Sequence, residues 1–308
     1  MSSAPDHRQH LDGVALAAMA VLVLVWGYNW VVMKIALRYA APFDFAALRT
    51  LGASACLLLT VLLLRPREFR VRYVRGTLLL GLLQTLCFVS LVNLALVHGG
   101  AGKSSVLVYS MPFWVALLAP LVLKVHSPRG HWPIIAMAFA GLLLILSPWE
   151  RTPDLVSSLL ALGAGLSWAL SVMVVKKIPV RNNWELLSLT GWQMFAGSVA
   201  LLVVAVSVPA HPIHWTWQFT LALLYNIGPG NALAWFLWLF IVTRLPVGVS
   251  SLNSLAIPVV GVLSAWLQLG ERPSCIETTG MLLVFMALAL LSFSARTRRA
   301  RNTKSTGL

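Results

Sequence analysis

Polar and aromatic side chains recur within the long apolar stretches of this sequence. Such groups are costly in contact with lipid, so each is expected to face a cavity or a neighbouring helix. The candidates for binding a solute are Trp26, Asn29, Gln84, Tyr109, Trp168, Asn226, Trp235, Ser251 and Asn253. Neutral hydrogen-bonding groups beside aromatic faces suit a small zwitterionic or amphipathic solute. The alternative is that the Ser and Asn side chains only bond neighbouring helices.

Arg49 is the one cation well inside an expected helix, whereas the acidic residues lie near helix ends. Arg49 could attract a solute carboxylate, extend to the membrane surface, or pair with Asp44. We favour the two structural interpretations, extension to the membrane surface or pairing with Asp44, because Arg49 lies close to one end of its segment. No acidic residue is expected at mid-membrane, so a mechanism that relies on a buried carboxylate is not expected, although Glu185 and Glu271 remain weak candidates.

Proline and glycine mark positions where helices should bend. Pro112 and Pro258 are expected in the middle of two helices, where each removes a backbone hydrogen bond. We interpret them as paired hinges. The run Gly228, Pro229 and Gly230 should break another helix and free carbonyls near Asn226 and Asn231, and such breaks commonly mark binding sites in transporters.

No constellation of catalytic or metal-binding residues stands out. The histidines all fall in loops or tails, and neither HExxH nor GxSxG occurs. The three cysteines, Cys56, Cys87 and Cys275, form no CxxC pair and are interpreted as small apolar residues. We therefore predict no catalytic residue, metal or cofactor. A membrane enzyme and a membrane sensor remain the remote alternatives.

The composition indicates a membrane protein. Of 308 residues, 59% are hydrophobic and only 10% are charged, whereas soluble domains carry about 25% charged residues. The net charge of +14 comes from short basic runs between apolar stretches. Such runs are typical of cytoplasmic loops beside anionic lipid and do not predict a nucleic-acid site.

Ten segments are long and apolar enough to cross a bilayer, which takes about 20 residues. They are residues 14–36, 43–64, 74–97, 103–123, 131–148, 154–175, 185–207, 217–240, 246–268 and 275–294. The sequence thus predicts an all-α membrane protein with ten transmembrane helices. Residues 295–308 should form a basic, disordered tail.

Lys and Arg residues predict the orientation. With a cytoplasmic N-terminal tail, residues 1–13, most basic residues fall on the cytoplasmic side, among them those at 65–75, 176–181 and 296–304. Few fall on the opposite side. By the positive-inside rule both termini are cytoplasmic. The expected location is the bacterial inner membrane.

The two halves of the chain resemble each other. Gly102 matches Gly248, Ser104–Ser105 match Ser250–Ser251 and Pro112 matches Pro258, all 146 residues apart, and Trp26 matches Trp168 at an offset of 142. Each half holds five spans, so the second half must enter the membrane from the opposite side. Inverted repeats of this kind are typical of secondary transporters, because equivalent halves can exchange inward and outward shapes.

Two stretches carry a family resemblance. WGYNWVVMKIALRYAAPFDFAALR, residues 26–49, is similar to the WGxN…K…P…LR pattern of the EamA branch of the drug/metabolite transporter superfamily. IPVVGVLSAWLQLGERPS, residues 257–274, is similar to its PVxG…GERP signature. The resemblance covers nearly the whole chain. It departs at the end of the fourth helix, which reads LKVHSPRG where the second half has GERP.

The resemblance implies two inverted five-helix repeats, residues 14–148 and 154–294, around a central cavity lined by helices one, three, four, six, eight and nine. It also implies export of amino acids or related amphipathic metabolites by alternating access. Import of a metabolite and export of drugs or cations are the alternatives. The expected partners are a small solute and membrane lipid, with no nucleic acid, and the protein is expected to be a monomer or homodimer.

Overall fold

A computed structural model describes residues 13–122, 132–147, 154–244 and 253–305. Within these ranges the secondary structure is helical and contains no strand. This is what lipid imposes on a chain with so few charges, because a helix satisfies its backbone polar groups within one segment.

The first half contains seven α-helices, one short 3₁₀-helix and one π-helical segment in its described part. In chain order they are α1 (Gly13–Ala36), α2 (Pro42–Leu64), η1 (Pro66–Glu68), α3 (Val74–Leu80), the π-helical η2 (Gly81–Cys87), α4 (Phe88–His98), α5 (Ala101–Val108), α6 (Met111–Val122) and α7 (Trp132–Leu146).

The second half follows the same plan. Its described elements are α8 (Asp154–Lys177), α9 (Asn183–Ser207), α10 (Trp217–Ile227), the π-helical η4 (Gly228–Leu233), α11 (Ala234–Arg244), α13 (Asn253–Ser264), the π-helical η5 (Ala265–Leu269) and α14 (Cys275–Ser305).

These elements form the ten expected membrane segments. Six of them in the described ranges are long and apolar enough to span by themselves: Gly13–Ala36, Pro42–Leu64, Val74–His98, Ala101–Val122, Leu155–Lys177 and Asn183–Ser207. Trp132–Leu146, Ala256–Leu269 and Cys275–Leu291 are shorter apolar helices. The α10–η4–α11 segment completes the set. The chain is therefore an all-α membrane protein of two inverted five-helix repeats.

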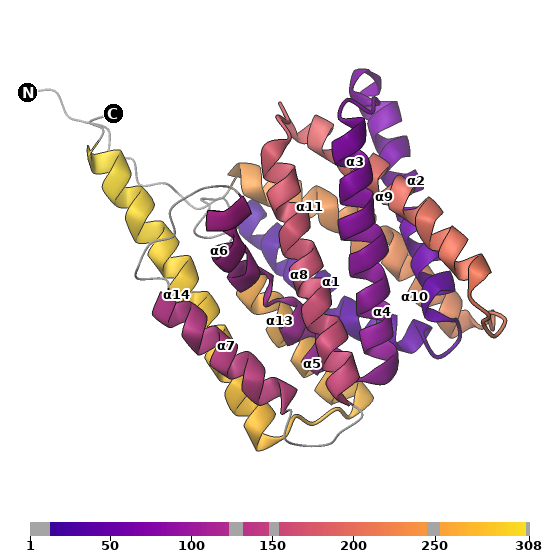
Figure 1. Ribbon diagram of the computed structural model, residues 1–308. Helices are drawn as coiled ribbons and strands as arrows, with labels where there is room; N and C mark the ends of the chain where they lie inside the picture. The colour runs from indigo at the N-terminus through magenta and orange to yellow at the C-terminus, as the bar shows by residue number, and fades with distance from the viewer. Residues whose placement is uncertain (1–12, 123–131, 148–153, 245–252, 306–308) are drawn as a thin grey trace, which may run out of the picture.

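The two halves pack together through equivalent helices at the edges of the bundle. Helix α2 packs against its counterpart α9, and α7 against its counterpart α14, at opposite edges of the bundle (Figure 1). Between these edges α1 packs on α10, α11 and α13, while α8 packs on α4, α5 and α6. The first helix of each half therefore packs mainly against helices of the other half, so helices of both halves bound the central space.

Two expectations about helix continuity were wrong. Pro112 does not lie in the middle of a helix, because α5 ends at Val108 and α6 begins at Met111, one residue before the proline. Pro258 does lie inside a helix, α13. The basic tail is not disordered over its described part, since α14 continues to Ser305.

The outer surface of the bundle is apolar, as lipid requires. Leu63 and Val206, for example, are 70% and 78% exposed. The interior holds large apolar side chains such as Phe45, Phe113 and Phe219, which are fully buried. Burial of apolar area does not by itself favour helix association in lipid, so close backbone packing must contribute.

Glycines provide that close packing at the α7–α14 edge. A Cβ atom at Gly141 would lie 2.7 Å from the carbonyl oxygen of Gly280, and one at Gly280 would lie 2.6 Å from the carbonyl oxygen of Gly141. The backbones of α7 and α14 therefore touch at this pair. Gly81 of η2 and Gly197 of α9 form a similar contact, since a Cβ at Gly197 would lie 2.5 Å from the Gly81 oxygen.

We predict that Gly141→Ala destabilises the protein although alanine favours helix. The added methyl group meets rigid backbone, and such overpacking costs about 1–3 kcal/mol. Gly163→Ala in α8 is the matched control, because its Cβ would meet only Leu91 Cδ1 at 3.6 Å. Thermal unfolding of both variants in detergent checks this. Equal unfolding temperatures would contradict the close contact of α7 and α14.

Candidate functional site: a central cavity between the halves

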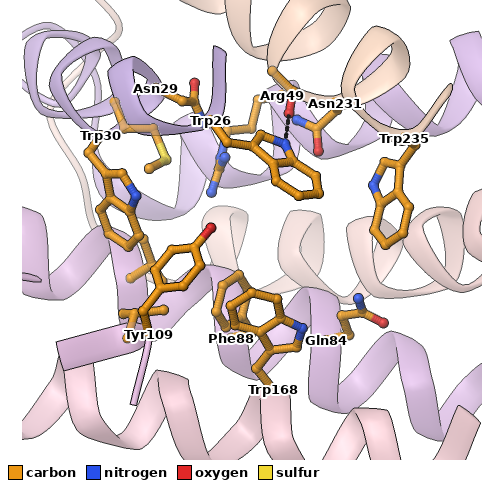
Figure 2. Close-up of a pocket in the computed structure, with 14 residues that line it drawn as sticks. Trp26, Asn29, Trp30, Arg49, Gln84, Phe88, Tyr109, Trp168, Asn231 and Trp235 are labelled. Carbon is orange, nitrogen blue, oxygen red and sulfur yellow. Dashed lines mark hydrogen bonds between the residues drawn. The ribbon is translucent and has the colours of Figure 1, made fainter. Parts of the chain in front are cut away.

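A cavity of about 160 Å³ lies between the two halves. Its walls come from α1, α2, the π-helical η2, α4, α5 and the turn after it in the first half, and from α8, η4 and α11 in the second (Figure 2). The lining residues are Trp26, Asn29, Trp30, Met33, Arg49, Gln84, Phe88, Val92, Val108, Tyr109, Trp168, Gly230, Asn231 and Trp235.

Helical irregularities surround this cavity. Gln84 lies in η2, Gly230 and Asn231 lie in η4, and Tyr109 lies in the break between α5 and α6. At that break Pro112 has no N–H, so the Val108 carbonyl loses its usual helical partner. Irregular backbone within a membrane is tolerated where it is buried in protein or borders a cavity, and π-helical segments often occur at functional sites.

Side chains from the opposite half satisfy the irregular backbone. Trp26 of α1 donates from Nε1 to the Gly230 carbonyl at 3.0 Å, drawn as the dashed line in Figure 2. Ser167 of α8 donates from Oγ to the Leu83 carbonyl of η2 at 2.7 Å. A side chain of each half therefore donates a hydrogen bond to a backbone carbonyl of the other half.

Aromatic rings form two walls of the cavity at equivalent positions of the repeat. Trp26 lies edge-on to Trp235, with ring centroids 6.2 Å apart. Across the cavity Trp168 packs against Phe88 at 5.6 Å and against Tyr109 at 5.5 Å. Figure 2 shows the Tyr109 hydroxyl directed toward the middle of this space. Such faces hold apolar groups or a cation.

The polar atoms of the lining are few and partly unsatisfied. Asn29 is 8% exposed, and its Oδ1 has no hydrogen-bond partner among the described residues. Asn231 donates from Nδ2 to the Asn226 carbonyl at 2.6 Å, which satisfies part of the η4 irregularity. A buried acceptor without a donor is costly, so the polar groups of the lining are not all satisfied within the described residues.

Arg49 is part of this cavity. The side chain is only 6% exposed. Its Nη1 donates to Asn226 Oδ1 at 3.2 Å, its Nη2 lies 3.5 Å from Asn93 Oδ1, and its guanidinium carbon lies 5.5 Å from the centre of the Phe45 ring. The expectation that Arg49 reaches the membrane surface or pairs with Asp44 is therefore wrong. Packing turns this face of α2 inward.

The structure brings six of the predicted binding residues together. Trp26, Asn29, Gln84, Tyr109, Trp168 and Trp235 all line the cavity. Asn226 is fully buried behind Arg49 and does not line it. Ser251 lies outside the described residues, and of Asn253 only the backbone, at the start of α13, is described.

The apolar residues of the lining were not predicted from the sequence. Trp30, Met33, Phe88, Val92 and Val108 line the cavity. An apolar residue in a membrane helix carries no signal that separates a cavity position from a lipid-facing one. The two asparagines that hold Arg49 did carry a signal, because each is a polar group inside an apolar span.

The carboxylates considered for coupling hold helix N-termini instead of lining the cavity. Glu271, after η5, accepts from the backbone N–H groups of Ala101 and Gly102 at 2.9 and 3.0 Å. Glu185 is 4% exposed and accepts from the Arg181 N–H at 2.8 Å. Negative charge is favoured at such helix starts. Among the described residues, no group of three or more His, Cys, Asp or Glu side chains could hold a metal.

Polar contacts join several helices at the Gly99 end of the bundle. Lys34, one residue after the cavity residue Met33, donates to the carbonyls of Leu96 and Gly99. Lys103 pairs with Glu277 at 2.9 Å. With the Glu271 contacts, these bonds hold the ends of α1, α4, α5 and α14 together beyond the cavity. We call them the Gly99-end network.

The chain is similar over nearly its whole length to proteins that are named as transporters. It is 29% identical to a "Probable amino-acid metabolite efflux pump" of Salmonella typhimurium, over 91% of this chain and 95% of that protein. It is 25% identical to the "Uncharacterized transporter YoaV" of Bacillus subtilis, over 90% and 96%. One solved crystal structure has the same fold, with a TM-score of 0.64 at 16% identity over 92% of this chain and 99% of that one.

The chain also matches the model of a protein family. The model described as "EamA-like transporter family" matches twice, over residues 13–147 and 155–293. Together these matches cover most of the chain and all the elements that line the cavity, so this multi-pass membrane protein belongs to the EamA-like transporter family.

Proposed function

We propose that this protein is a secondary transporter of the bacterial inner membrane that exports amino acids or related amphipathic metabolites. The observation that carries the proposal is the central cavity, which both halves line with aromatic rings, neutral amides and one guanidinium. The name of the Salmonella relative, "Probable amino-acid metabolite efflux pump", agrees with this solute class.

The proposed mechanism is alternating access, in which one end of the cavity is closed while the other is open. The Gly99-end network joins the two halves on one side of the cavity, because Lys103 and the start of α5 belong to the first half, whereas their partners Glu277 and Glu271 belong to the second. Transport requires these bonds to break while equivalent helices close the other end. Inverted repeats favour such an exchange, because the two closed shapes are built from related elements.

The distribution of charge supports an orientation with the Gly99 end outside. The α2–α3 connection holds Arg65, Arg67, Arg70 and Arg72. It meets the basic connection between α8 and α9, where Arg72 lies 3.5 Å from a carboxylate oxygen of Glu185. A basic end of this kind belongs in the cytoplasm by the positive-inside rule.

We predict that the purified protein in liposomes moves labelled amino acids, whereas empty liposomes do not. In cells, overexpression should raise tolerance to toxic amino-acid analogues, because an exporter lowers their internal concentration. Trp168→Ala should reduce both effects by removing one aromatic wall, while Trp132→Ala, at an exposed position, should reduce neither. Tolerance gained against cationic drugs alone would support drug or cation export instead.

We predict that the double substitution Pro112→Ala and Pro258→Ala slows transport with little change in the half-saturating concentration. Alanine restores the backbone donors that the prolines lack, which stiffens the fourth and ninth segments. Pro120→Ala, near the far end of α6 and away from the break between α5 and α6, is the control. Initial rates in liposomes over a range of solute concentrations measure this, and unchanged rates would remove the prolines from the mechanism.

We predict that Glu271→Gln shifts the protein toward the state open at the Gly99 end. The substitution removes the charge from two hydrogen bonds to the start of α5, which weakens them. In a variant without its native cysteines, Met33→Cys should react faster with a membrane-impermeant maleimide applied from outside. Glu68→Gln, whose carboxylate lies at the other end beside Arg72 at 3.6 Å, should not raise the rate. Equal labelling rates for the two variants would show that the network is not a gate.

A further inference from the structure

The charge of Arg49 has no anionic partner within the described part of the chain. Its contacts are two amide oxygens and one aromatic ring. Its Nε has no hydrogen-bond partner there, although the atom is buried. A buried charge without a counter-charge is strongly unfavourable, the more so at membrane depth. The position therefore calls for an anion that is not part of these residues.

We propose that Arg49 is the carboxylate-binding residue of the central cavity and that it restricts the transported solutes to molecules carrying a carboxylate. The inference rests on the proposed transport function and narrows its solute class. Arg49 lines the cavity, and a guanidinium binds a carboxylate through two parallel hydrogen bonds, a stronger and more directional contact than one to a neutral group.

Two asparagines hold the guanidinium in place while leaving donors for a ligand. Asn93 donates from Nδ2 to the Pro42 carbonyl at 2.9 Å, and Asn226 donates from Nδ2 to the Ala222 carbonyl at 3.0 Å. These bonds turn both amide oxygens toward Arg49. The oxygens occupy two of the five N–H groups of the guanidinium. The side chain is thus fixed before a ligand arrives, which reduces the entropy lost on binding.

The rest of the cavity suits the other parts of such a solute. Asn29, Gln84 and Asn231 add neutral amide groups to the lining, and an amide oxygen accepts hydrogen bonds of the kind that an ammonium group donates. Trp26, Tyr109 and Trp168 offer faces to an apolar side chain. A solute that is only cationic would find aromatic rings but would be repelled by Arg49 at close range. The cavity therefore favours a zwitterion or an organic anion over an amine.

The test compares solutes that differ only in the carboxylate. The purified full-length protein is titrated with neutral L-amino acids and, for each, with the amine that lacks its carboxylate, such as L-phenylalanine against phenethylamine. 3-Phenylpropionate, which lacks the ammonium group, completes the set. Thermal stabilisation and quenching of the cavity tryptophans report binding. We expect carboxylate-bearing probes to bind at least about tenfold more tightly than the amines, a difference of about 1.4 kcal/mol.

Substitutions connect this preference to Arg49. Arg49→Gln should abolish the difference between acid and amine, and Arg49→Lys, which keeps the charge without the planar fork, should retain part of it. Arg38→Gln removes a charge from an exposed position and should change nothing. A melting curve of Arg49→Gln shows whether this variant folds. If it does not, the affinities of wild type and of Arg49→Lys for acids and amines still test the role of Arg49.

The outcomes separate this inference from the transport function. Wild-type protein that binds the amines as well as the amino acids, or that binds no carboxylate-bearing probe, overturns the role of Arg49. So does a folded Arg49→Gln variant that keeps the preference for carboxylates. If liposomes transport the amines equally well, the protein is a transporter but the carboxylate rule is wrong. If probes bind through Arg49 but none is transported, Arg49 is a carboxylate-binding residue, and the transport function fails together with the restriction on transported solutes.

Discussion

Hydrocarbon offers no partner to a free N–H, carbonyl or charge, so every such group of this chain must find one inside the protein or in a bound solute. Regular helices meet this condition for most of the backbone. Around the cavity they do not, and the missing partners come from the other half of the chain. Trp26 of the first half bonds the Gly230 carbonyl of the second, and Ser167 of the second bonds the Leu83 carbonyl of the first.

This exchange explains why irregular backbone and functional side chains occur together. The π-helical segments η2 and η4 bring Gln84 and Asn231 to the cavity. They are also the segments whose carbonyls need a partner from α1 or α8. A side chain such as Trp26 therefore does two things, since it satisfies the backbone of η4 and presents its ring to the central space. Changes in the cavity should accordingly alter the contact between the halves.

The charges divide into two groups by position. At the helix ends carboxylates meet backbone N–H groups or cations, as Glu271, Glu277 and Glu185 do. In the cavity the described residues supply a single cation, Arg49, with only neutral groups around it. The ends can therefore open and close by breaking ion pairs and hydrogen bonds, while the centre keeps a constant charge toward the solute.

The sequence by itself determined the ten segments, the inverted halves and the irregularity at Gly228–Gly230, because each depends on local features: apolar length, a repeat offset, and residues that cannot continue a helix. It also pointed to Trp26, Asn29 and Trp168, since such groups do not face lipid. Only the tertiary structure decided which face each helix turns inward. That rotation is set by packing between segments far apart in the chain. It placed Arg49 in the cavity beside Asn226, interrupted the fourth segment before Pro112 instead of at it, and selected Met33 and Val108 from many similar apolar residues.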